Sequence, residues 1–554
     1  MKKRNTVFWI FSKIRRRIPA LCVMTVAHVG TALLGVAFAL GSRNVIDSAV
    51  AGDRDAFIYA CIMQGAVIVG TLLCLAIYRH LHERLLADLD KDWKSSLLHG
   101  LLHGDYSEVS GYHSGELINR LNNDVRTVND GILSVLPSGA AMLIRVIAAV
   151  IVLAGMEPRF TVLVVSGGVV VLAVTGFLRR RLKRLHKKVS EQDGKVSGFL
   201  QEILEKLLMV QAMDLSGEVE SRADKLLIER YFFQRKRKNI SVLANMAVSI
   251  LSYGAGFVAL IWCSARMLNG TMSFGSLTAI TQLVSQVQMP FTNLSSVIPK
   301  YIAMTAAAER LIELEEISHL PEDTLTDGSA AYAQMRGIGA DSVSFSYDRD
   351  QILENASFAM PKGAFAVVTG PSGIGKSTLL KLFLGVFRPD KGTLYLNVGG
   401  ERLTLGRSTR KLFAYVPQGN LLLSGTLRDN LLITKPDASE EQIRQAVYVS
   451  AMDEYLSQLP KGLDTPLGEN AAGLSEGQAQ RLAIARAVLG GAPILLLDEC
   501  TSALDERTEK TVLERIRGLH DRTCIVVTHR PAAVEMCDWR LEIGNGTVNA
   551  FKAE

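Results

Sequence analysis

The sequence predicts a chain of two parts: a membrane bundle of six transmembrane helices, followed by an α/β domain of the P-loop NTPase class with a helical subdomain. Three observations predict this fold class. The N-terminal half holds six long apolar segments, and the C-terminal half holds a glycine-rich phosphate-binding pattern and an apolar strand that ends in two carboxylates. The composition agrees, because a mean hydropathy of +0.20 with 21% charged residues is rare in a wholly soluble chain.

Charge and cysteine usage exclude several classes of function. A formal charge of +6 over 554 residues gives no support for nucleic-acid binding. The seven cysteines are scattered without a CxxC pair, so neither a disulfide framework nor a zinc site is expected. No cleavable signal peptide is expected either, because the apolar stretch after the basic N-terminus is too long.

The six apolar segments have the length that a helix needs to cross a bilayer, about 20 residues. They are residues 18–40, 56–78, 132–155, 160–178, 242–268 and 274–298. Basic clusters lie at the N-terminus, after the fourth segment and before the fifth, whereas the turns inside each pair carry few charges. Since basic loops stay in the cytoplasm, we expect a multi-pass protein of the plasma or inner membrane with both termini cytoplasmic.

Two long hydrophilic excursions, 79–130 and 179–240, show helical patterning. We interpret them as membrane helices that continue below the bilayer and turn near 104–115 and 213–218, where they would contact the soluble domain. The expected division is 1–317 for the transmembrane domain, 318–335 for a linker and 336–554 for the nucleotide-binding domain.

A strand at 364–369 leads into the pattern G-x-x-x-x-G-K-[ST], and a helical pattern follows. Such glycines let backbone N–H groups face phosphates, and the helix N-terminus favours an anion. Lys376 would reach the β- and γ-phosphates of ATP, and Ser377 would ligate Mg²⁺. The ATP-binding set predicted here is Gly370, Pro371, Ser372, Gly373, Ile374, Gly375, Lys376, Ser377 and Thr378.

A second strand, residues 494–497, runs into Asp498 and Glu499. Four apolar residues ending in two acids suit a buried parallel strand with its carboxylates at the carboxyl edge of the sheet. Asp498 would hold the metal, directly or through water, and Glu499 would act as the general base toward the attacking water. The alternative is a strand that merely ends in surface acids, and the phosphate loop in the same chain disfavours it.

From these residues onward the sequence resembles the ATP-binding cassette (ABC) family. Residues 474–478, Leu-Ser-Glu-Gly-Gln, resemble the family's signature motif, and all the family's motifs occur in its order between about 336 and 550. The resemblance implies a glutamine loop at Gln418 that also reaches the metal, a D-loop at Asp505, a switch histidine at His529 and an adenine-stacking ring at Tyr347. His529 joins Glu499 as a catalytic residue.

The membrane half resembles the exporter type of the family at 114–125, at 272–277 and at Pro290. The resemblance implies the six-helix exporter fold fused to its own cassette, a half-transporter. It also implies that ATP is held between two chains, so that Ser475, Gly477, Gln478 and Asp505 contact the ATP of the partner. A homodimer is favoured over a heterodimer. Glu476 and Cys500 depart from the family's usual glycine and alanine; Glu476 adds negative charge near a phosphate site, and Cys500 is expected to have little effect.

Arg145 lies near the middle of the third span, where a charge is costly and usually faces water or a partner. One hypothesis is that Arg145, with Gln282 and Gln286 of the last span, lines the translocation cavity and favours an anionic or amphipathic cargo. The other is a structural ion pair or hydrogen bond to a neighbouring helix. Gln282 and Gln286 could likewise line the cavity or form hydrogen bonds between helices.

The resemblance thus implies an ATPase that drives export of an amphipathic, lipid-like, drug or peptide cargo by alternating access. An importer on the same fold and one half of a heterodimeric transporter remain alternatives, since a fold does not fix direction. A non-transporting ABC ATPase that acts on nucleic acid is disfavoured by the six spans.

Overall fold

The computed structural model describes residues 6–317, 328–347, 350–419, 422–468 and 473–553. The chain divides into two units, which are taken here one at a time. Unit 1 is Met1–Gly100 with His113–Glu316, and unit 2 is Leu101–Tyr112 with Ile317–Glu554. The expected linker 318–335 lies outside the described residues up to position 327; α11, Gly328–Ala333, occupies its described part.

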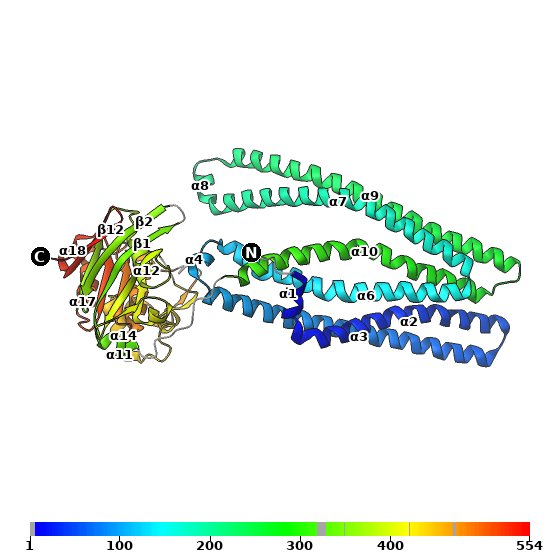
Figure 1. The fold of residues 1–554 in the computed structure, drawn as a ribbon, viewed down its shortest axis with the longest axis horizontal. Helices are drawn as coiled ribbons and strands as arrows, with labels where there is room; N and C mark the ends of the chain where they lie inside the picture. The colour runs from blue at the N-terminus through cyan, green and yellow to red at the C-terminus, as the bar shows by residue number, and fades with distance from the viewer. Residues whose placement is uncertain (1–5, 318–327, 348–349, 420–421, 469–472, 554) are drawn as a thin grey trace. The chain divides into compact units, whose positions relative to one another are not determined.

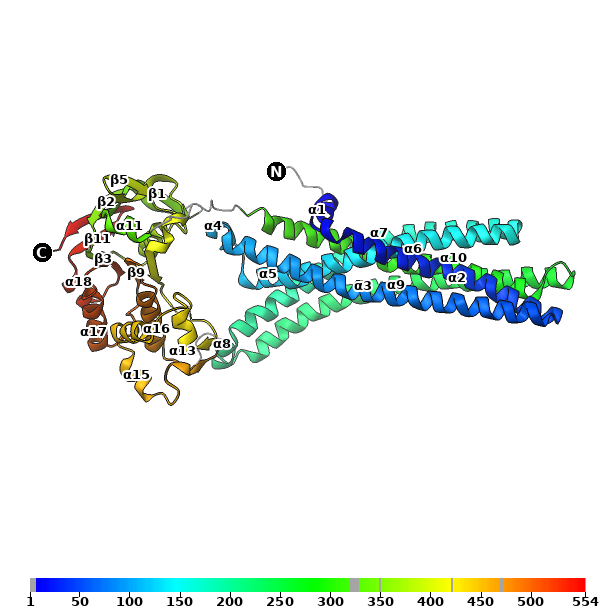
Figure 2. The same ribbon diagram turned by 90° about the horizontal axis from the view of Figure 1, so that it is seen from below.

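Unit 1 is a bundle of long helices (Figures 1 and 2). They are α2 (Ile18–Ala51), α3 (Arg54–His103), α6 (Val125–Met156), α7 (Pro158–Glu205), α9 (Ser216–Leu268) and α10 (Phe274–Glu315). Shorter helices are α1 (Thr6–Lys13), α5 (Ser114–Asn119) and α8 (Leu207–Ala212). With 32 to 53 residues, the long helices exceed the length that a bilayer needs, as the continuation below the membrane predicts.

Four helical stretches among the described residues have the length and composition of membrane spans: Arg15–Ala51, Arg54–His103, Ser114–Met156 and Ser249–Leu268. The other two expected spans, 160–178 and 274–298, lie within the continuous helices α7 and α10. Polar residues such as Gln282 and Gln286 lower the hydropathy of α10. All six expected segments are therefore helical.

The sequence-predicted tips are present. The first lies between the end of α3 and the start of α5 and carries a short helix, α4 (Tyr106–Val109); the second surrounds α8. The first tip belongs to unit 2. There the Tyr106 ring lies 5.8 Å from that of Phe387, and Arg407 donates to the His103 carbonyl at 3.1 Å.

The rest of unit 2 is built on two larger sheets. An antiparallel sheet has the order β2-β1-β4-β5, and a mostly parallel one has the order β12-β11-β3-β10-β9-β6. The strands of the first are β1 (Met335–Tyr347), β2 (Asp350–Pro361), β4 (Lys391–Val398) and β5 (Glu401–Thr404). Those of the second are β3 (Phe365–Thr369), β6 (Phe413–Val416), β9 (Ile494–Asp498), β10 (Thr523–Val527), β11 (Trp539–Gly544) and β12 (Thr547–Lys552).

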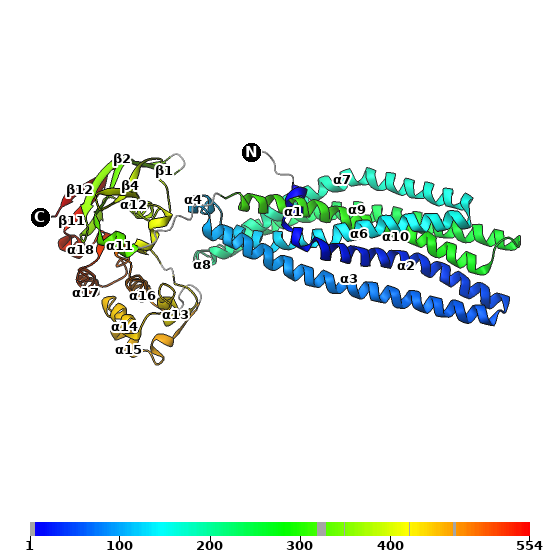
Figure 3. The ribbon, with the colours of Figure 1, turned by 60° about the horizontal axis from the view of Figure 1, so that its bottom comes forward.

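The helices of unit 2 cover the sheets and form the expected helical subdomain. They are α12 (Lys376–Phe383), α13 (Leu427–Leu432), α14 (Glu440–Val449), α15 (Asp453–Gln458), α16 (Glu476–Leu489), α17 (Glu506–Arg517) and α18 (Pro531–Met536). Helices α13 to α16 gather beside one another, away from the antiparallel sheet (Figure 3). The small strands β7 (Gly425–Thr426) and β8 (Pro466–Leu467) pair next to them.

Register in the parallel sheet decides where functional side chains meet. Val527 lies opposite both Val368 and Asp498, so β3, β9 and β10 end together at one edge. All three strands are buried along nearly their whole length, as expected of apolar runs covered on both faces. The loops that follow them therefore share the carboxyl edge, which is where open α/β sheets bind ligands.

Candidate functional site

The phosphate loop follows β3 and owes its shape to glycine. Gly370, Gly373 and Gly375 have φ of +146°, +80° and +107°, values that L side chains rarely adopt. A Cβ at Gly370 would also stand 2.7 Å from the Ile543 carbonyl oxygen. The loop thus turns its backbone around the N-terminus of α12, an arrangement suited to an anion.

Lys376 is the first residue of α12 and is only 6% exposed. Its Nζ donates to the carbonyl oxygens of Gly370 and Pro371, both at 2.9 Å. Burial lowers the pKa of Lys376, and the nearby carboxylates of Glu499 and Asp498 oppose that shift. The Lys376 ammonium is therefore held within the backbone loop that would surround the phosphates of a nucleotide.

Asp498, at the end of β9, is buried and accepts hydrogen bonds on both oxygens. The Ser377 hydroxyl donates to Oδ1 at 2.9 Å, and the Tyr415 hydroxyl donates to Oδ2 at 3.1 Å. Burial raises the pKa of Asp498, while the two hydrogen bonds favour its charged form. Burial, foremost, and the charge of Asp498 raise the pKa of Tyr415, so its hydroxyl keeps its proton.

Glu499 adopts a left-handed backbone conformation, with φ +47°. Strain of this kind in a residue other than glycine is common at active sites. Its backbone N–H donates to the Val527 carbonyl at 3.0 Å, and its carboxylate accepts from the Gln418 amide at 2.8 Å. The structure thereby joins Gln418 and Glu499, which the sequence predicted from motifs some 80 residues apart.

Tyr347 and His529 complete this edge. The Tyr347 hydroxyl lies 3.4 Å from the Thr378 hydroxyl, and the rings of Phe345 and Phe387 meet the Tyr347 ring edge-on at 5.0 and 5.3 Å. Tyr347 remains 38% exposed, which leaves room for a stacked base. His529 follows β10 by two residues and is exposed; within the described chain its side chain makes no hydrogen bond or ion pair with Glu499.

The oxygen donors at this edge fit Mg²⁺. The ion prefers hard oxygen ligands and keeps several waters, so it needs few protein groups beside substrate phosphates. Ser377 and Asp498 already lie in hydrogen-bonding contact, and the Gln418 amide lies beside the neighbouring Glu499. Among the described residues no cluster of three or more His, Cys, Asp or Glu side chains forms a metal site, so phosphates and water would have to complete the coordination.

The signature residues lie at the start of α16. Ser475 caps this helix by accepting from the Gln478 N–H at 3.3 Å, and the Gln478 side chain accepts from the Ser475 N–H at 2.8 Å. A Cβ at Gly477 would stand 2.9 Å from the Ala503 carbonyl oxygen. Glu476 is exposed in the first turn, where a negative charge is favourable for the helix dipole.

Sequence reasoning missed Gln480, which ties the signature helix to the D-loop. Its buried side chain donates to the Ser502 hydroxyl at 3.1 Å and accepts from the Ala503 N–H at 3.1 Å. Asp505 ends this loop by capping α17 through the Thr508 N–H at 2.9 Å. The signal available in the sequence was a second glutamine two residues after the signature motif.

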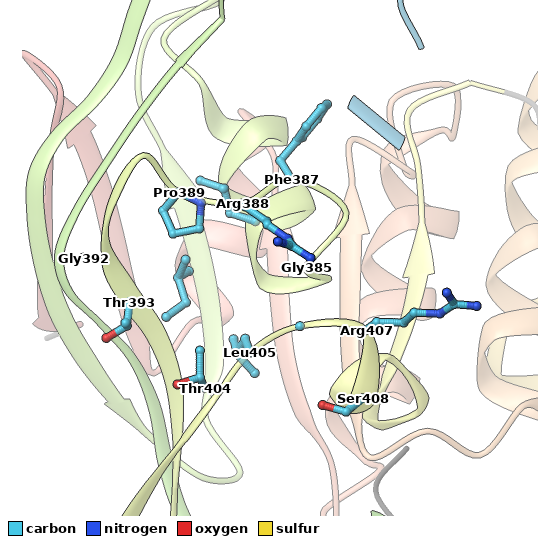
Figure 4. A pocket seen from close by; sticks show the side chains of 13 residues that line it. Gly385, Phe387, Arg388, Pro389, Gly392, Thr393, Thr404, Leu405, Arg407 and Ser408 are labelled. Carbon is cyan, nitrogen blue, oxygen red and sulfur yellow. The ribbon is translucent and has the colours of Figure 1, made fainter. Parts of the chain in front are cut away.

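A separate cavity of about 400 Å³ lies beside β4 and β5 (Figure 4). Arg388, Thr404 and Arg407 are among its lining residues. Arg407 turns its guanidinium away from the others (Figure 4), and it donates to His103 of the first tip. The cavity is thus next to the tip contact and does not include the phosphate-loop residues.

In unit 1, the residues expected to line a cargo cavity have few partners. Arg145 donates from Nη1 to the Met289 sulfur at 3.1 Å, and no ion pair within the described chain includes it. The Gln286 side chain lies against Gly35, while Gln282 is half-buried one turn away on α10. Of the two structural alternatives, the described chain shows the hydrogen bond to a neighbouring helix, α10, and no ion pair.

The exporter-like motif 114–125 forms a charged network with the end of α10. Residues Arg120–Asp124 adopt a π-helical turn, a feature that often marks functional sites. Arg120, 6% exposed, pairs with Glu313 at 3.0 Å, and Arg310 holds buried Asp124 at 2.8 and 2.6 Å. Sequence reasoning noted the motif but not these pairs, which span almost 200 residues.

The second membrane motif, 272–277, packs against the end of α2. Asp47 accepts from the Ser273 hydroxyl and from the Gly275 N–H, both at 2.9 Å. A side chain at Gly275 would strike the Arg43 carbonyl oxygen, which explains the glycine. The motif therefore fixes how α10 begins beside α2.

Comparison with known proteins gives matches along the chain. Residues 21–291 match the model of the ABC transporter transmembrane region, and 353–502 match that of the ABC transporter domain. The chain is 32% identical over 423 residues (74% of it, 71% of the relative) to the mycobactin import ATP-binding/permease protein of Mycolicibacterium smegmatis. It is 28% identical over 442 residues (78% and 75%) to the ATP-dependent lipid A-core flippase of Vibrio vulnificus.

The fold also matches a solved structure, that of a bacterial Atm1-family ABC exporter with ATP bound. The TM-score is 0.81 at 22% identity, over 98% of this chain and 95% of that one. The match supports the predicted fold class: a six-helix exporter-type membrane domain joined to a P-loop cassette.

Proposed function

The chain belongs to the ABC transporter family, and we propose that two copies of it form an ATP-driven exporter of an amphipathic cargo. Membership makes the chain a membrane protein whose cassette binds nucleotide and couples ATP hydrolysis to transport. One observation carries the assignment of the catalytic site. At one sheet edge Lys376, Ser377, Asp498 and Glu499 lie together, each held by a named partner.

In this proposal the phosphate loop and Lys376 bind the phosphates of ATP, and the open face of Tyr347 stacks on adenine. Ser377, Asp498 and Gln418 would hold Mg²⁺, which when bound neutralises phosphate charge. Glu499 is the general base, oriented by the Gln418 amide. His529 acts from the end of β10 as the second catalytic group.

The dimer follows from the signature residues. Ser475 is exposed at the N-terminus of α16, an arrangement able to receive a phosphate, and it has no role at its own chain's phosphate loop in this proposal. We assign Ser475, Gly477, Gln478 and Asp505 to the ATP of the partner chain. Gln480 transmits the position of the signature helix to the D-loop. A homodimer needs no further chain and stays our first choice over a heterodimer.

The membrane assignments are also proposals. We place the transmembrane domain at 1–317, the linker at 318–335 and the cassette at 336–554, with both termini cytoplasmic in the plasma or inner membrane. Export agrees with the exporter-like motifs, and the relative named as a lipid A-core flippase agrees with an amphipathic cargo. The relative named as a mycobactin importer keeps import as the alternative. ATP-driven accumulation inside inverted vesicles distinguishes export from import.

Glu499→Gln tests the catalytic assignment. In the reconstituted full-length protein we expect at least a ~100-fold loss of ATPase turnover, the scale of a general base, while ATP binding is retained. Glu506→Gln, an exposed change in the first turn of α17, is the matched control and should hydrolyse ATP normally. Turnover by Glu499→Gln at the rate of this control would refute the role given to Glu499.

A further inference from the structure

Arg145 places a permanent positive charge deep in the membrane bundle. It lies 11 residues before the end of α6, or about 16 Å along the helix, close to the middle of a hydrocarbon core of about 30 Å. A charge at this depth is costly unless an anion or water compensates it. The question is therefore what compensates Arg145.

The chain supplies no such anion. None of the six expected spans, from 18–40 to 274–298, contains an aspartate or a glutamate. Because a second copy has the same spans, homodimer formation adds no acid at this depth. The recorded partner of the guanidinium is the Met289 thioether, which is only a weak acceptor. Within the described chain, this leaves water or a bound anion to compensate the charge of Arg145.

Neighbouring side chains leave further polar atoms without partners. Nε of Arg145, Nδ1 of His28 on α2 and Oε1 of Gln286 on α10 are all buried and unpaired within the described chain. The charge of Arg145 acts on His28, whose ring stacks on Tyr78 of α3 at 4.5 Å. We call His28, Tyr78, Arg145, Gln286 and Met289 the polar column.

The polar column extends along α2 for a distance that suits a polar headgroup. Gln286 lies against Gly35, which is seven residues beyond His28 on α2, a rise of about 10 Å. Buried donors and acceptors without partners cost free energy unless a ligand or water satisfies them. The guanidinium, the imidazole and the amide are spaced along this length, and side chains of these kinds recognise phosphate or carboxylate.

We propose that the polar column binds the phosphate or carboxylate group of an amphipathic molecule, with the guanidinium of Arg145 as its counter-charge. The apolar part of that molecule is required because the group must enter a bundle that lies within the bilayer. This inference rests on the proposed function, since it names the class of the transported molecule. The anion belongs either to the cargo or to a membrane lipid headgroup.

The test measures binding of three amphiphiles with the same tail: dodecyl phosphate, dodecyl maltoside and dodecyltrimethylammonium. The full-length protein is placed in phosphatidylcholine nanodiscs without nucleotide, and binding is measured by equilibrium dialysis. We expect dodecyl phosphate to bind about tenfold more tightly than the others, and Arg145→Gln to remove that preference, as the loss of a charged hydrogen bond implies. Arg159→Gln, an exposed arginine at the start of α7, should keep it.

Equal binding of the three probes, or the same preference in Arg145→Gln, overturns the inference. Nanodiscs of phosphatidylglycerol separate the two sources: if this lipid displaces dodecyl phosphate from the wild type, a lipid headgroup is an occupant of the column. ATPase activity of the same nanodiscs is measured separately. Protein that hydrolyses ATP but binds the probes alike refutes only the anion site, whereas protein that binds dodecyl phosphate through Arg145 but hydrolyses nothing refutes only the proposed function.

Discussion

Two cations, the buried Lys376 and the half-buried Arg145, are compensated in opposite ways. The Lys376 ammonium has two backbone carbonyls from its own loop, with the carboxylates of Asp498 and Glu499 nearby. Within the described chain the Arg145 guanidinium has one thioether as its partner. The cation of the nucleotide site is therefore compensated by groups of its own chain, whereas the cation of the polar column has no anionic partner in the described chain. The difference separates a motor site whose cation is neutralised within its own chain from a transport path whose cation, as we propose, is neutralised by a bound anion.

The largest test of this comparison asks whether the nucleotide site is complete within one chain. Lys376→Ala disables the phosphate loop, and Ser475→Ala disables the signature. If each ATP is shared, a mixed dimer of the two variants contains one site with both defects and one intact site. We expect co-expressed variants to hydrolyse ATP well above the sum of the variants purified separately. If co-expression gives no such recovery, the shared site is contradicted. In the control experiment, Lys391→Ala, at an exposed lysine of β4, takes the place of Lys376→Ala.

A second test concerns a buried anion that the chain itself neutralises. Arg310→Ala would leave Asp124, 4% exposed, without its bidentate partner. Removing one member of a buried ion pair destabilises the fold. Because Arg310 is itself half-exposed, we expect the free energy of unfolding to fall by about 2 kcal/mol. Thermal unfolding in detergent measures the change. Arg402→Ala, from an exposed pair with Asp341, should cost less than about 1 kcal/mol; equal losses would show that Asp124 is not stabilised by Arg310.

A third test sharpens how the nucleotide site is preorganised. Tyr415→Phe removes the hydrogen bond to Oδ2 of Asp498 and leaves the Asp498 carboxylate free to rotate. We expect the Mg²⁺ concentration for half-maximal ATPase activity to rise about fivefold, as for one hydrogen bond of about 1 kcal/mol. At saturating Mg²⁺ the rate should recover. Tyr395→Phe on β4 is the control, and an unchanged Mg²⁺ dependence in Tyr415→Phe would rule out this positioning role.

The smallest expected effect is at Cys500, directly after Glu499. Its thiol is 1% exposed, and burial raises its pKa to about 12, so it stays neutral and unreactive. Cys500→Ala should change ATPase turnover less than about twofold, because an alanine fits where the thiol packs. Maleimide should label this thiol only after unfolding. Rapid labelling of the native protein at Cys500 would contradict its burial.

The sequence predicted the parts of the molecule whose chemistry is local. The phosphate loop and the acids after β9 are contiguous patterns, and the six apolar segments need only a count of residues. The contacts between them were not predictable, because they depend on register. Tyr415 reaches Asp498 only since β6 and β9 are neighbours, and Gln480 reaches Ala503 only after α16 packs beside the D-loop.

In the membrane unit the same limit is stronger. Arg120 and Glu313 are in contact but far apart in the sequence, and neither sequence pattern indicates that the other is its partner. For Arg145 the sequence left open a hydrogen bond to a neighbouring helix or a structural ion pair. The spans contain no acid to form one, and the structure pairs the guanidinium with Met289, which leaves the anionic ligand as the counter-charge we propose.

The position of the first tip determines which part of the chain can be exchanged. Residues 101–112 belong to unit 2, where Tyr106 covers the Phe387 ring and His103 accepts from Arg407. A cassette transplanted from a related protein as one continuous C-terminal piece would lack its own first tip. It would have to contact the first tip of the recipient protein instead. The interchangeable module is therefore discontinuous, and a working chimera has to replace two stretches of sequence together.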